Sequence, residues 1–127
     1  MTRQANRVLA IAWTGIVALL VLGAMSCDSS EQTVHIVAED FRFTPAMVHV
    51  SAERPIRLKI ANEGREPHEF KSLLLAHQTG FTSAPPSSLP VLPNQRTETI
   101  IRTFPGVYLF YCAIRGHAGM RGTIIVE

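Results

Sequence analysis

The chain has 127 residues, a length that suits one domain with a single hydrophobic core and leaves no room for a second. Its 12 basic and 10 acidic side chains give a formal charge of +2, and Arg3 and Arg7 supply the excess. The segment after Cys27 is therefore formally neutral. This balance excludes the strongly basic surface of a protein that binds nucleic acids, and we expect no nucleic-acid partner.

The first 27 residues have the pattern of an export signal. Arg3 and Arg7 precede an uncharged, almost wholly apolar run from Val8 to Met25. Small residues then lead to Cys27, which resembles the lipid-bearing Cys of a bacterial lipoprotein. We therefore expect residues 1–27 to be a signal peptide or membrane anchor, with lipidation at Cys27 as the leading interpretation. An uncleaved membrane helix and simple secretion are the alternatives, and all three place the rest of the chain outside the cytoplasm.

Residues 28–32 form a polar linker before the predicted domain, which spans residues 33–127. The strict alternation of apolar and basic residues from Pro55 to Ile60 predicts a strand with one buried and one wet face. Other β-rich runs bounded by turn residues predict further strands at 33–43, 47–50, 95–103, 107–112 and 122–127.

Two segments fit this strand pattern less well. Residues 73–76 begin another short element, and residues 79–94 are rich in Gly, Ser and Pro, which predicts an irregular excursion without an assigned role. No helical period is visible after the export signal. About seven short strands with very little helix favour an all-β fold, a Greek-key β-sandwich.

The residues best suited to chemistry lie near the C-terminus. Cys112, His117 and Met120 fall within nine residues, in a glycine-bearing loop between two predicted strands. A thiolate, an imidazole and a thioether form a soft donor set, which favours copper over calcium, magnesium or manganese. Alone, each residue has a simpler explanation in packing or exposure. Their coincidence outweighs those explanations and predicts a metal site.

A blue-copper site needs a second histidine in addition to these three donors. His68 is the candidate, because Pro67 stiffens the backbone directly before it. The cysteine count agrees with a metal site. With Cys27 assigned to the signal, Cys112 has no disulfide partner in the exported domain, and a metal would occupy this odd thiol.

Glu69 has two interpretations. It is either a surface acid beside the site or a carboxylate that enters the copper shell or selects another metal, since oxygen donors prefer harder ions. The other histidines have no predicted role. His35 and His49 alternate with apolar strand neighbours and should face solvent, and His77 lies in the excursion.

The motifs at 62–70, 104–112 and 116–126 resemble those of cupredoxins, the small blue-copper proteins, in the order first His, Cys, second His and Met. The resemblance covers most of residues 33–127. It implies a two-sheet Greek-key sandwich that holds one type 1 copper ion, with the ligands His68, Cys112, His117 and Met120. Two features differ from many members: the interval from His117 to Met120 is short, and Glu69 stands where an Asn is common.

The resemblance also implies a function. We expect an extracytoplasmic electron carrier that cycles Cu(II)/Cu(I), works as a monomer, serves a membrane or extracytoplasmic redox protein, and is not an enzyme. In the family the second histidine is a partly exposed ligand and the exit for electrons. The docking face would then surround His117 and include Ala113, Ile114, Ala118 and Gly119. The alternative is a copper-delivery or metal-uptake accessory that binds and releases copper.

Overall fold

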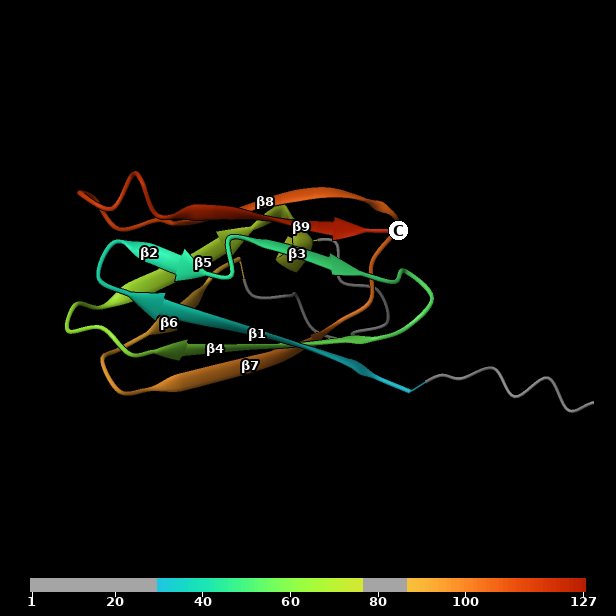
Figure 1. The fold of residues 1–127 in the computed structure, drawn as a ribbon, viewed down its shortest axis with the longest axis horizontal. Coiled ribbons are helices and arrows are strands. Elements are labelled where there is room, and N and C mark those ends of the chain that lie inside the picture. Colours follow the sequence, from blue (N-terminus) through green and yellow to red (C-terminus); the bar gives the residue numbers. More distant parts are fainter. Residues whose placement is uncertain (1–29, 77–86) are drawn as a thin grey trace, which may run out of the picture.

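The computed structural model describes residues 30–76 and 87–127 (Figure 1). The predicted export signal with Cys27 lies outside these described residues, and so do residues 77–86, which include His77 and the first part of the predicted excursion at 79–94. Within the described ranges the chain is almost entirely β, with nine strands and a single short helix. No helix there is long and apolar enough to cross a membrane.

The strands form two sheets that face each other, with β4 and β7 at the bottom of Figure 1 and β8 and β9 at the top. The first sheet has the order β2 (Arg42–Thr44), β1 (Gln32–Glu39), β4 (Ile56–Asn62), β7 (Arg96–Ile101). The second has the order β3 (Met47–Val50), β9 (Arg121–Val126), β8 (Gly106–Cys112), β5 (His68–Ser72), β6 (Leu89–Val91). The helix α1 (Leu73–Ala76) follows β5 directly. The β1–β4 and β3–β9 pairs are parallel and the others antiparallel, and the chain crosses repeatedly between the sheets, as in a Greek-key sandwich.

The core lies between the sheets and follows the alternation in the sequence. Along β4, Ile56, Leu58 and Ile60 are buried while the basic residues between them are partly exposed, as predicted for this strand. In the second sheet, the rings of Phe70 and Phe110 stack with centroids 5.1 Å apart. Fixed inner-face residues of this kind give the neighbouring strand ends a rigid support.

Aromatic packing also explains a glycine of β9. A Cβ atom built at Gly122 would lie 2.2 Å from a ring carbon of Phe110 and 2.5 Å from the backbone oxygen of Ala46. No side chain fits in this space. Gly122 therefore lets β9 pass against the core ring of Phe110.

The structure corrects the expected number of strands, about seven, to nine in the described residues. The predicted strand 33–43 is two strands, because the chain reverses at Asp40 and Phe41 without a Gly, Pro or Asn turn signal. The predicted excursion contains β6, which pairs with β5 and places Pro90 opposite Glu69. β6 ends its sheet, where a proline without a backbone N–H is tolerated. The short element expected at 73–76 is α1.

Candidate metal centre

The four predicted ligands meet at one end of the sandwich. His68 is the first residue of β5 and Cys112 is the last residue of β8. β5 and β8 are antiparallel neighbours with Phe70 opposite Cys112, so the two side chains are brought to the same end of the sheet. His117 and Met120 lie in the loop between β8 and β9. The four residues are 1 %, 5 %, 8 % and 0 % exposed, in the order His68, Cys112, His117, Met120.

The donor atoms of the histidines and the cysteine converge. One nitrogen from each of His68 and His117 and the sulfur of Cys112 all lie within 4.8 Å of one another. The sulfur is 3.4 Å from Nδ1 of His117, so this nitrogen faces the thiol. Neither ring nitrogen of His68 finds a hydrogen-bond partner among residues 30–76 and 87–127, although both are buried. A buried polar atom without a partner is costly, and a metal ion at the point of convergence would remove that cost.

The surroundings also favour the ligating form of His68. Burial lowers the pKa of this imidazole by withdrawing it from water, and the nearby His117 lowers the pKa further. A neutral imidazole is the form that binds a metal, so the site does not need to displace a proton from His68 near neutral pH.

Backbone hydrogen bonds hold the loop that carries His117 and Met120. The N–H of Cys112 donates to the carbonyl of Met120 at 2.9 Å, the N–H of Met120 to that of His117 at 2.9 Å, and the N–H of His117 to that of Ile114 at 3.1 Å. Gly116 has φ of +93°, a conformation that glycine adopts without strain. These contacts fold the short interval between Cys112 and Met120 compactly, with both side chains buried together.

Glu69 supports the cysteine through its backbone. Its N–H donates to the sulfur of Cys112 at 3.4 Å, and its carbonyl accepts from the N–H of Ala113 at 3.0 Å. Its carboxylate accepts a hydrogen bond from the hydroxyl of Ser88 and is not among the donors that converge. A backbone N–H directed at the sulfur stabilises a thiolate whatever side chain follows the first histidine.

Asn62 positions the first histidine, a role that sequence reasoning missed although the residue begins the motif at 62–70. It is buried, and its Nδ2 donates to the carbonyls of Glu66 at 2.8 Å and Val91 at 2.9 Å. Its Oδ1 accepts from the N–H of Gly64 at 2.9 Å. Asn62 thus fixes the loop between β4 and β5, which ends at His68. Only the turn preference of Asn hinted at this in the sequence.

The second histidine is more enclosed than the resemblance implied. His117 is buried, and the ring of Phe41 packs against it with centroids 5.1 Å apart. Phe41 was missed because its segment alternates like a continuous strand. Around this histidine, the predicted docking residues Ala113, Ala118 and Gly119 are exposed and Ile114 is half-buried. A groove of about 580 Å³ beside them is also lined by Leu109, Tyr111, Arg115 and Arg121.

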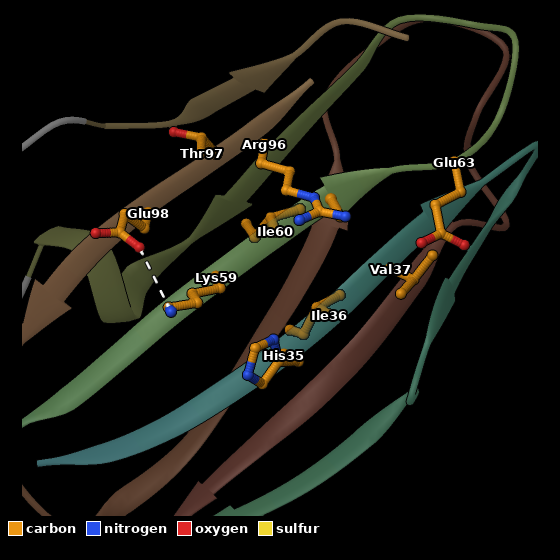
Figure 2. Close-up of a pocket in the computed structure, with 10 residues that line it drawn as sticks. His35, Ile36, Val37, Lys59, Ile60, Glu63, Arg96, Thr97 and Glu98 are labelled. Carbon is orange, nitrogen blue, oxygen red and sulfur yellow. Dashed lines mark ion pairs between the residues drawn. The ribbon is translucent and has the colours of Figure 1, made fainter. Parts of the chain in front are cut away.

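His35 and His49 are exposed, as predicted, and neither belongs to the converging cluster. His35 lines a second groove, of about 520 Å³, on the outer face of the first sheet (Figure 2). Charged side chains of both signs line this groove, and the Nζ of Lys59 forms an ion pair there with Oε2 of Glu98 at 3.8 Å. This mixed, open surface lacks the buried convergence of the His68 site.

Comparisons with known proteins agree with this geometry. The profile of the Cupredoxin-like domain family matches residues 9–126. The copper-resistant cuproprotein CopI of Rubrivivax gelatinosus is 32 % identical, with 77 % of this chain and 68 % of that protein covered. Among solved structures, auracyanin A, a blue copper protein of Chloroflexus aurantiacus, matches with a TM-score of 0.61 at 17 % identity, covering 77 % of this chain and all of that one. Auracyanin of Roseiflexus castenholzii matches with a TM-score of 0.60 at 15 % identity, covering 76 % and 97 %.

The fold, the donor set and the family match lead to one conclusion. The residues His68, Cys112, His117 and Met120 are positioned as a type 1 copper site, with two imidazoles, one thiolate and one thioether. The unpartnered nitrogens of His68 fit a bound ion. The cofactor is one copper ion, and the chain belongs to the cupredoxin-like family.

Proposed function

We propose that this protein carries electrons, cycling its copper between Cu(II) and Cu(I), and is not an enzyme in itself. The observation that supports this proposal is the preformed site, in which backbone hydrogen bonds already fix the elements that carry the four donors. A site held rigidly can suit both copper states, so each one-electron transfer needs little rearrangement. Oxidases and reductases built on this fold need further copper sites, and one domain of this length offers a single cluster in its described residues.

The partner is a membrane or extracytoplasmic redox protein that docks on the face around His117. Ala113, Ile114, Ala118 and Gly119 give this face a small, mostly apolar surface, which suits a weak and transient complex. The protein works as a monomer outside the cytoplasm, on the outer face of the cytoplasmic membrane. That side is the periplasm if the cell has an outer membrane.

The N-terminal segment serves as the tether, with lipidation at Cys27. Tethering raises the local concentration of membrane partners without any new contact. Replacing the lipid-bearing residue, Cys27→Ala, should therefore release the protein from membranes, measured by fractionation. Continued retention of this variant would point instead to an uncleaved helix.

A second candidate function is copper delivery or uptake, in which the protein binds copper in order to hand it on. One observation favours it: the relative from Rubrivivax gelatinosus is described as a copper-resistant cuproprotein. The two functions make opposite demands on the site. An electron carrier must keep its copper through many cycles, whereas a delivery protein must release it.

The discriminating experiment follows copper through redox cycles. The full chain is loaded with one copper, reduced with ascorbate and reoxidised with hexacyanoferrate(III), ten or so times, beside an excess of a Cu(I) chelator. An electron carrier should keep its metal through every cycle and regain its full blue colour at each reoxidation to Cu(II). Transfer of most of the copper to the chelator during the first reduced periods would favour delivery instead.

A further inference from the structure

The turn between β1 and β2 has an unusual backbone. Glu39 pairs with Arg42, so only Asp40 and Phe41 connect the two strands. Phe41 has φ of +67°, a left-handed conformation that turns normally assign to Gly or Asn. A bulky aromatic residue is strained there, and such strain persists only where surrounding contacts enforce it.

Contacts of Asp40 with residues 64 and 65 hold this turn in place. Its carboxylate accepts hydrogen bonds from the backbone N–H of Arg65 at 2.8 Å and from the Nε of the same residue at 3.3 Å. Gly64 packs so closely that an added Cβ would lie 2.6 Å from the Asp40 carboxylate and 2.9 Å from the Asp40 backbone nitrogen. Residues 64 and 65 belong to the loop that ends at His68. The turn is therefore fastened to the support of the first copper-site histidine.

The ring of Phe41 reaches the other histidine. Its centroid lies 5.1 Å from that of His117, with the two planes at 79°. The ring of His117 also lies near that of His68, with ring centroids 5.2 Å apart. Phe41 is 58 % exposed, whereas His117 is 8 % exposed. An exposed aromatic ring thus packs against an enclosed imidazole.

We propose that Phe41 is a positioning residue of the copper centre: held by the strained turn, its ring closes the solvent side of His117 and slows the escape of copper. For copper to leave, an imidazole must rotate away and water or a chelator must enter. The ring obstructs both movements, and its edge-to-face contact adds a modest attraction that holds the imidazole in place. The inference rests on the copper site alone and is independent of whether the protein carries electrons or delivers copper.

The test uses the copper-loaded full chain and three variants. Phe41→Gly removes the ring and relieves the backbone at the same time, because glycine accepts a positive φ. Phe41→Tyr keeps a ring of the same shape. Asn94→Gly is the matched control, since Asn94 also has a positive φ, +61°, in the turn before β7. Its backbone N–H donates to the carbonyl of Asn62 at 3.0 Å, and a glycine keeps this hydrogen bond. The rate at which excess EDTA removes Cu(II) is followed by the loss of the thiolate-to-copper absorption band.

We expect Phe41→Gly to lose copper about two- to tenfold faster, as a contact of this strength implies, and Phe41→Tyr and Asn94→Gly to match the unmodified protein. In the metal-free protein, Phe41→Gly should also shift the NMR resonances of the His117 ring protons, because a neighbouring ring current is removed. Thermal unfolding of metal-free Phe41→Gly checks that this variant is folded. Its unfolding midpoint should not fall below that of the unmodified protein, because the glycine relieves the backbone strain. An unchanged extraction rate in Phe41→Gly, or an equal increase in Phe41→Tyr or Asn94→Gly, would overturn the proposal.

Discussion

Replacing Asn62 by Ala should destabilise both the fold and the copper site. The Asn62 side chain makes three hydrogen bonds, to the carbonyls of Glu66 and Val91 and from the N–H of Gly64. A net contribution of about 0.5–1.5 kcal/mol for each bond, together with the burial of Asn62, gives a loss of about 2–4 kcal/mol in the free energy of unfolding. For a domain of this size, such a loss lowers the midpoint of thermal unfolding by roughly 10–30 °C.

The assay is urea unfolding of the metal-free protein, followed by far-ultraviolet circular dichroism. Glu63→Ala is the control, because Glu63 is the exposed neighbour of Asn62 on the same loop, and its loss should change the free energy by less than about 0.5 kcal/mol. The copper-loaded Asn62→Ala variant should also release metal faster, since the loop that places His68 is loosened. A stability loss in Asn62→Ala no larger than in the control would refute this account of how His68 is positioned.

Three further predictions follow from the site and its turn. Cys112→Ser should abolish the intense thiolate-to-copper colour, because an alcohol does not ionise as a thiol does, whereas His35→Ala should leave the visible spectrum unchanged. Met120→Leu should keep the colour and raise the reduction potential measured by voltammetry, since a lost donor disfavours Cu(II), and Met120→Gln should lower it. Equal potentials in the unmodified protein and both variants would remove Met120 from the axial position. Hydrogen bonds from the backbone N–H and the side chain of Arg65 lower the pKa of Asp40, so its ionised form stabilises the fold at neutral pH and that contribution disappears as pH falls through the lowered pKa. Asp40→Asn should therefore be less stable than the unmodified protein at pH 7 and equally stable in strong acid, and a constant difference in urea midpoint across this range would show that the charge of Asp40 plays no part.

Local patterns in the sequence predicted much of this molecule. The alternation at Ile56, Leu58 and Ile60 identified a strand because burial on one face of a sheet has a period of two. The loop from Cys112 to Met120 could be predicted as part of a metal site because three soft donors lie close together along the chain. His68 could be named as a candidate from Pro67 before it and from the family resemblance. Its place beside Cys112 could not be read from any local pattern, because the pairing of β5 with β8 joins segments about 40 residues apart.

The features that escaped prediction depend on contacts between distant parts of the chain. Phe41 occupies a turn position that its own preference opposes, and the hydrogen bond between Asp40 and the N–H of Arg65 helps to hold the turn there. β6 is a strand because β5 offers it an open edge, although its own composition indicates a loop. The hydrogen bond from the Glu69 N–H to the cysteine sulfur is a property of the backbone, which no side-chain pattern reveals.

The most direct test of the central claim is a visible absorption spectrum recorded while the metal-free full chain is titrated with Cu(II). Convergence of His68, Cys112 and His117, with Met120 buried beside them, predicts an intense blue thiolate-to-copper band that saturates at one copper per chain. A protein that stays colourless, or that binds Cu(II) without this band, would contradict the assignment of these residues as a type 1 copper site.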